Sequence, residues 1–103
     1  MIKVSVLYPN SPGATFDMDY YLDRHMPLVR KKSGAACKGT AVDQGLAGGA
    51  PGAPATYVAM GHILYETIED FQSVFAQHGT ALLADIPNFT NTQPTIQISA
   101  VKS

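Results

Sequence analysis

The three histidines of the chain, His25, His62 and His78, are the side chains best suited to chemistry near neutral pH. An imidazole titrates in that range and can act as an acid, a base or a metal ligand. His25 and His78 fall on the apolar sides of two expected helices, and His62 lies on a central strand that faces either their pocket or a subunit interface. We predict proton transfer with His25 as the catalytic residue and the other two as ligand contacts. The alternative, that each is a core histidine satisfied by one hydrogen bond, stays open.

Three further polar groups are predicted to orient a ligand. Tyr8 ends the first expected strand and is followed by Pro9 and Asn10, which places a phenol and an amide at the mouth of a pocket. Tyr21 precedes His25 by four residues and shares its helix stripe. Such groups orient a small apolar ligand that carries one or two polar atoms. The alternative is that the aromatic residues only form the core.

Other site chemistries lack their sequence signatures. None of the spacings HxxxH, CxxC or HExxH occurs, so no metal site is predicted, although joint binding by the three histidines stays open. No serine lies in a GxSxG turn, and the glycines of residues 45–55 do not fit a phosphate-binding loop. The single Cys37 is typical of a structural strand residue, and its pairing with His25 as a nucleophile stays open. We predict no cofactor.

Composition limits the classes of function that the chain can have. Its 103 residues predict one domain, and a net charge of −1 without a basic stripe argues against nucleic-acid binding. No apolar stretch approaches the ~20 residues of a membrane span. The lone cysteine and the lack of a signal-like N-terminus predict a cytoplasmic protein. Only 15% of the residues are charged, well below the usual quarter, which favours an oligomer.

Hydrophobic periodicity predicts four strands and two helices. The strands are expected near residues 2–8, 36–44, 56–65 and 95–101, and the helices near residues 17–32 and 68–78. Asp17 and Thr67 are expected to cap the helices, and Pro27 is expected to kink the first one because it removes a backbone donor. Residues 45–55 are expected to be irregular, and residues 79–94 to be irregular or a short extra turn.

The element order βαββαβ predicts an α+β, ferredoxin-like fold over residues 1–103. Such a domain is a four-stranded antiparallel sheet with both helices on one face. The strands carry apolar residues on both faces, so the face without helices also needs a cover. A homodimer that pairs the two sheets supplies it, because two-fold dimers are the commonest assembly.

One segment, residues 8–29, resembles a known family. The matching features are the YPN after the first strand, Gly13, Phe16-Asp17, Tyr20-Tyr21 and His25-Met26-Pro27-Leu28, with His78 and Pro87-Asn88-Phe89 as weaker points. In these the chain is similar to the EthD family, named for ethyl tert-butyl ether degradation. The resemblance implies a dimeric α+β barrel and degradation of small organic compounds. The wider group includes monooxygenases, isomerases, cyclases and haem enzymes, so the fold does not define the reaction.

Three functional hypotheses follow. The first is a cofactor-independent homodimer that binds a small apolar or aromatic metabolite, in which His25 moves a proton in an isomerase, cyclase or lyase-type step. The second is a non-catalytic carrier or accessory protein for a partner oxygenase. The third is a structural or stress-related dimer with a vestigial pocket. The sequence leaves open whether the chain is an enzyme at all.

Overall fold

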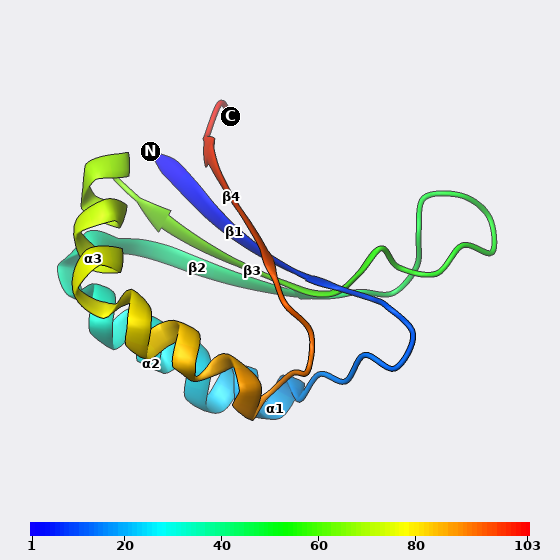
Figure 1. The fold of residues 1–103 in the computed structure, drawn as a ribbon. Coiled ribbons are helices and arrows are strands. Elements are labelled where there is room, and N and C mark those ends of the chain that lie inside the picture. Colours follow the sequence, from blue (N-terminus) through cyan, green and yellow to red (C-terminus); the bar gives the residue numbers. More distant parts are fainter.

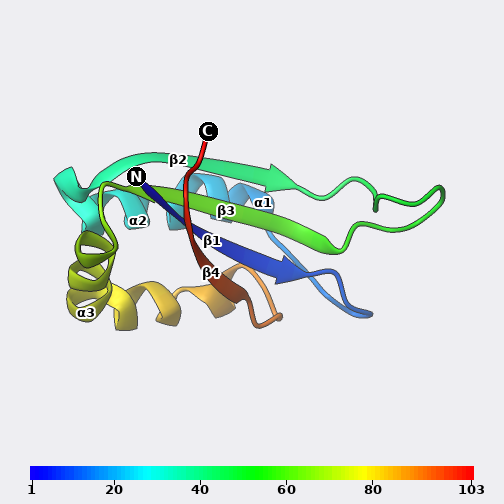
Figure 2. The same ribbon diagram turned by 90° about the horizontal axis from the view of Figure 1, so that it is seen from above.

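Four strands and three α-helices account for most of the chain, of which the computed structural model describes residues 1–103. The strands are β1 (Ile2–Pro9), β2 (Cys37–Gln44), β3 (Tyr57–Tyr65) and β4 (Thr95–Ala100), and the helices are α1 (Met18–Tyr20), α2 (Met26–Ser33) and α3 (Ile68–Ala84). The strands form one antiparallel sheet in the order β2-β3-β1-β4, with all helices on one face (Figures 1 and 2). This confirms the predicted α+β ferredoxin-like arrangement. None of the three helices combines the length and the hydrophobicity that a membrane-spanning helix requires.

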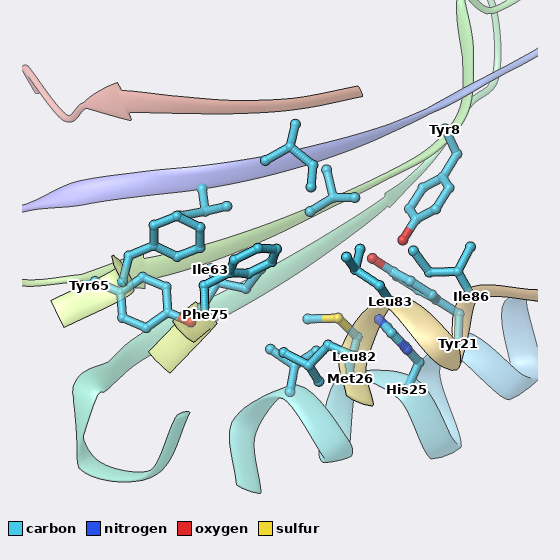
Figure 3. Close-up of a pocket in the computed structure, with 15 residues that line it drawn as sticks. Tyr8, Tyr21, His25, Met26, Ile63, Tyr65, Phe75, Leu82, Leu83 and Ile86 are labelled. Carbon is cyan, nitrogen blue, oxygen red and sulfur yellow. The ribbon is translucent and has the colours of Figure 1, made fainter. Parts of the chain in front are cut away.

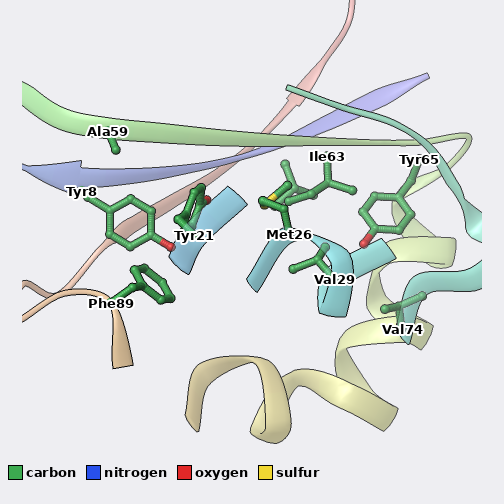
Figure 4. Packing of buried hydrophobic residues seen from close by; sticks show 10 residues of the cluster. Tyr8, Tyr21, Met26, Val29, Ala59, Ile63, Tyr65, Val74 and Phe89 are labelled. Atoms are coloured by element: carbon green, nitrogen blue, oxygen red, sulfur yellow. The ribbon is translucent and has the colours of Figure 1, made fainter. Parts of the chain in front are cut away.

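The two central strands place alternate residues on opposite faces, as their period-two patterns predict. Val4 lies opposite Ile63 and Tyr8 lies opposite Ala59, and all four are at most 6% exposed on the helix-covered face. They form the core together with residues of the helices (Figure 4). The opposite face has no covering element. We call it the outer sheet face.

The first predicted helix is interrupted by a wide turn. Between α1 and α2, residues Tyr21–His25 form a π-helical turn, in which the backbone N–H of Met26 donates to the carbonyl of Tyr21. Asp17 caps the start of the helix as predicted, accepting from the N–H of Tyr20 at 3.0 Å. The predicted distortion is therefore confirmed, but it lies before Pro27 rather than at it. A wide turn suits this position because Pro27 offers no N–H for the regular ladder and crowds the preceding turn.

Helix α3 is longer than the sequence predicts. Thr67 caps it as expected, accepting from the N–H of Asp70 at 3.1 Å, but the helix continues to Ala84 instead of ending near residue 78. The prediction that residues 79–84 are irregular is wrong. Gly79 suggested a helix end, yet it is buried in the helix, where a Cβ would lie only 3.1 Å from the ring of Phe75. Packing therefore overrides the poor helix propensity of this glycine.

The connection between β2 and β3 projects away from the domain as a narrow arm (Figures 1 and 2). It comprises residues 45–56, and we call it the β2–β3 arm. It contains no helix or strand, as its glycines and prolines predict. The arm contributes to the elongated outline of the molecule, 41 × 33 × 19 Å.

Candidate functional site

A cavity of about 70 Å³ lies between the sheet and the helices (Figure 3). Fifteen residues line it, and fourteen of them are hydrophobic or aromatic. They come from the three strands β1, β3 and β4, the π-helical turn, α2, α3 and the turn after α3: Val4, Val6, Tyr8, Tyr21, Met26, Val29, Ile63, Tyr65, Phe71, Phe75, Leu82, Leu83, Ile86 and Ile96. The fifteenth is His25. The cavity is thus an apolar chamber with one imidazole in its wall.

His25 is held by a carboxylate that comes from the far end of α3. The side chain of His25 is 7% exposed, and its Nδ1 lies 2.9 Å from Oδ2 of Asp85. The other oxygen, Oδ1, accepts from the hydroxyl of Tyr20 at 2.7 Å and from Nδ2 of Asn88 at 3.0 Å. Each oxygen of Asp85 therefore has its own partners, so the carboxylate is fixed in orientation and fixes the ring of His25 in turn.

The protonation states of this pair follow from their surroundings. Burial lowers the pKa of His25, and the hydrogen bond and charge of Asp85 offset that effect only in part. Burial acts to raise the pKa of Asp85, but the hydrogen bonds from Tyr20, Asn88 and His25 outweigh it and lower the pKa. At neutral pH the pair is thus a neutral imidazole beside an ionised carboxylate. The ring proton belongs on Nδ1, since only a donor there suits the carboxylate.

The second ring nitrogen of His25 is free to react. No protein group hydrogen-bonds Nε2. The structure has no fully buried side-chain nitrogen or oxygen without a partner, so Nε2 is not fully enclosed, and His25 is one of the residues that line the cavity. With the proton on Nδ1, Nε2 carries a lone pair. The arrangement is that of a general base oriented by a carboxylate.

Acid is expected to weaken the fold through His25. An unfolded histidine titrates near pH 6.5, and the folded pKa of His25 lies lower. Between the folded and the unfolded pKa of His25, the unfolded state binds more protons than the folded state. The contribution of neutral His25 to the free energy of unfolding is therefore complete above pH ~6.5 and is lost as the pH falls through the folded pKa. We expect the free energy of unfolding in urea to decline over this window in wild type and in His78→Gln, but less in His25→Gln. Equal declines in wild type and His25→Gln would contradict a neutral buried imidazole.

Two phenols line the same cavity as His25. Tyr8 and Tyr21 are each 1% exposed. Burial raises the pKa of Tyr21 to about 12, and burial together with the neighbouring Tyr21 raises the pKa of Tyr8 as well, so both remain hydroxyl donors. The ring of Tyr21 also stacks on His25, with centroids 5.3 Å apart and planes inclined by 16°. The phenols can donate to a ligand oxygen while His25 accepts a proton.

Gly61 makes room for the Tyr21 hydroxyl. A Cβ at this buried position of β3 would overlap the hydroxyl oxygen of Tyr21. We expect Gly61→Ala to displace that phenol and to lower the free energy of unfolding by about 1–3 kcal/mol, the usual cost of overpacking. The matched control is Gly39→Ala on β2, where a Cβ would meet Leu64 at an ordinary 3.4 Å. Urea unfolding of both variants tests this, and equal stabilities would show that the site adapts without cost.

The chain matches the EthD domain over residues 14–93, a segment that includes His25, Asp85 and the residues that hold them. The chain belongs to the EthD family. A solved EthD-like protein from Ralstonia eutropha JMP134 is 46% identical, with a TM-score of 0.94 over 99% of this chain and 92% of that chain. A solved ethyl tert-butyl ether degradation (EthD) family protein from Bacillus halodurans C-125 is 22% identical, with a TM-score of 0.75 over 99% of each chain, and shares the fold. No curated protein matches significantly.

The EthD fold brings together three of the six residues that the sequence predicts for the site, namely Tyr8, Tyr21 and His25. Asn10 instead donates from Nδ2 to the carbonyl of Ala55 at 2.9 Å, outside the cavity. His78 is half-buried on α3 and does not line the cavity, although it lies on the same side of the helix as Phe75 and Leu82. The expected convergence of the imidazoles is therefore not found. Cys37 does not line the cavity that contains His25 either.

His62 lies on the outer sheet face in a polar network of its own. Its Nδ1 is 2.9 Å from Oγ of Ser5, and its Nε2 is 3.1 Å from Oδ2 of Asp43. These are the residue types of a hydrolytic triad, but none of them lines the apolar cavity. Ser5 also pairs with strands on both sides, which commits its backbone to the sheet rather than to an oxyanion. We interpret the network as a polar feature of the outer sheet face.

The sequence analysis missed Asp85, the partner of His25. It lies within residues 79–94, which the sequence predicted to be irregular, and it is 60 positions away from His25 along the chain. One signal was available. Asp85 is the only charged residue in that otherwise polar and apolar stretch.

Proposed function

We propose that this EthD-family protein binds a small, neutral, apolar or aromatic metabolite in the cavity and that His25 transfers a proton to or from it. The observation that carries the proposal is the fixed, uncharged imidazole, whose Nε2 is unpaired in an otherwise apolar chamber. The chemistry is that of a cofactor-independent isomerase, cyclase or lyase in the degradation of organic compounds. His25 acts as the base, and Tyr8 and Tyr21 donate to the oxygen on which charge develops.

The lining supports a neutral ligand. No lysine or arginine contributes to the cavity. A carboxylate inside it would be buried without a cationic partner, which is strongly unfavourable. A neutral carbonyl or phenol can instead use the phenolic donors, and its acidic C–H or O–H can face Nε2 of His25.

The ligand enters between α3 and β4. Phe75, Leu83 and Ile96 line the cavity yet are 38%, 45% and 42% exposed, so they form its mouth. The free volume of about 70 Å³ is below that of a cavity known to hold benzene, ~150 Å³. A benzene-sized ligand therefore extends into this mouth.

Deuterium uptake by a model ketone tests the proposal. Phenylacetone is neutral and aromatic and has an acidic methylene beside its carbonyl. Wild type in D₂O is expected to accelerate exchange of that methylene, measured by proton NMR, above the rate in buffer alone and above that with boiled protein. Exchange at the buffer rate, with no binding of phenylacetone, argues against a catalytic cavity for ketones of this class.

A second candidate function is a carrier for a partner oxygenase. A chamber with fourteen hydrophobic or aromatic lining residues suits an apolar cargo without any need for His25. A carrier is expected to retain compounds through purification, which native mass spectrometry followed by denaturing release would detect. Bound compound without any exchange chemistry favours the carrier.

We further propose a homodimer that pairs two outer sheet faces. That face carries half-buried apolar residues, among them Leu7, Met60 and Leu64, with no element of this chain over them. The accessible surface of 6198 Å² also exceeds the ~5,600 Å² typical of a monomer of this mass. Both features support a partner on this face.

A further inference from the structure

The β2–β3 arm is an uncharged projection that the single chain leaves in solvent. Its twelve residues, 45–56, include no charged side chain, and Leu46 is 93% exposed. The arm continues beyond the ends of β2 and β3, away from the helices and the cavity (Figures 1 and 2). An exposed leucine within twelve consecutive uncharged residues forms a continuous apolar surface that is open to a partner.

The arm has a defined conformation. The N–H of Gly48 donates to the carbonyl of Ala53 at 2.9 Å, and the N–H of Ala53 donates to the carbonyl of Ala50 at 3.0 Å. The tip is Pro51-Gly52, and the φ of 75° at Gly52 is the left-handed value that a type II turn requires. A Cβ at Gly48 would also collide with the carbonyl of Pro54 across the ribbon. Since the ribbon is already ordered, it loses little conformational entropy on docking.

The base of the arm is fastened to the end of β1. The backbone N–H of Asn10 donates to the carbonyl of Thr56 at 3.1 Å, and its side-chain Nδ2 donates to the carbonyl of Ala55 at 2.9 Å. A Cβ at Gly45 would overlap the carbonyl of Tyr57, so the two limbs are in close contact where they leave the sheet. Asn10, predicted from the sequence to contact a ligand, here holds the direction of the arm.

The outer sheet face by itself is smaller than a standard protein interface. Its four strands have between six and nine residues. With strands ~4.8 Å apart and a rise of ~3.3 Å per residue, the face covers about 500 Å². A stable interface buries about 800 Å² per partner. One side of the arm, two limbs wide and five or six residues long, adds about 200 Å² and lies next to the outer sheet face, because β2 and β3 carry both.

We propose that the β2–β3 arm is a docking element that lies on a second copy of this chain, with Leu46 buried against the partner. The inference rests on the homodimer of the proposed function and adds to it a second contact element, which brings the contact area to about 700 Å² per partner. A second copy fits better than an acidic or basic partner because the arm has no charge to offer either. A second copy also fits because the arm is continuous with the outer sheet face, so that the same partner can cover both.

Sedimentation equilibrium over a wide protein concentration range tests the proposal. Leu46→Asp is expected to raise the dimer dissociation constant at least 10-fold, because an aspartate would be buried in an apolar contact. The matched control is Leu22→Asp, which changes another exposed leucine, 46% exposed and on the helical side of the molecule. It should leave the dissociation constant unchanged. Asn10→Ala, which frees the base of the arm, should weaken the dimer less than Leu46→Asp does.

The possible outcomes distinguish the role of the arm from the existence of the dimer. A wild-type chain that is monomeric at every concentration overturns the homodimer and the arm with it. A wild-type dimer whose dissociation constant is the same in Leu46→Asp overturns the arm alone and leaves the sheet pairing in place. Circular dichroism of each variant confirms the fold, which a change at a residue 93% exposed is not expected to disturb.

Discussion

Replacing His25 with glutamine is expected to slow protein-catalysed deuterium exchange into phenylacetone by about 10²–10⁴-fold, the usual contribution of a positioned general base. Glutamine is close to histidine in size, and its amide can still donate a hydrogen bond to Asp85. It has no lone pair of useful basicity to replace Nε2. The rate of deuterium uptake, measured by proton NMR at pH 7.5 for wild type and variant, gives the effect directly.

The matched control for this experiment is His78→Gln. That residue lies on α3, outside the cavity, so its replacement should leave exchange at the wild-type rate. Comparable exchange in wild type and His25→Gln would remove His25 from the mechanism. A loss of exchange in which phenylacetone still binds, seen by ligand-observed NMR, would assign His25 to chemistry rather than to packing.

The sheet was predictable because its signal is local. Residues that alternate along β1 and β3 report directly which face each side chain takes, so Val4 and Ile63 could be assigned to one side of their strands, while their pairing is known from the structure. The same locality made the caps predictable. Asp17 and Thr67 each accept from an N–H three residues later, an interaction set within one turn of chain.

The site was only half predictable because its decisive contact is distant in sequence. Tyr8, Tyr21 and His25 could be assigned from strand alternation and helix periodicity. The contact between His25 and Asp85 depends instead on where α3 ends, and Gly79 concealed that end because its burial against Phe75 is a tertiary effect. Periodicity places His78 with Phe75 and Leu82 on α3, yet it lies outside the cavity, since an apolar helix side is wider than the strip that meets the cavity.

The second large effect is expected for Asp85→Asn, through the tautomer of His25. Tyr20 and Asn88 both donate to Oδ1 of Asp85, so that position must remain an acceptor. The asparagine amide is therefore oriented with its oxygen there and its NH₂ toward Nδ1 of His25. A donor at that point requires Nδ1 to accept, which moves the ring proton to Nε2. The base is then lost although His25 is still present, and we expect exchange to fall toward the same 10²–10⁴-fold range.

A tautomer effect can be distinguished from a loosened site. Nitrogen-15 NMR of the imidazole should show the proton on Nδ1 in wild type and on Nε2 in Asp85→Asn, a change that a merely structural role would not produce. Tyr20→Phe is the matched control: it removes one donor to Asp85 but keeps the carboxylate and the contact to His25, so exchange should fall less than 10-fold. Wild-type exchange in Asp85→Asn, or an unmoved proton, would show that Asp85 does not position the base. In the proposed mechanism the carboxylate therefore acts through the proton that it keeps on Nδ1, because that proton leaves Nε2 free to react.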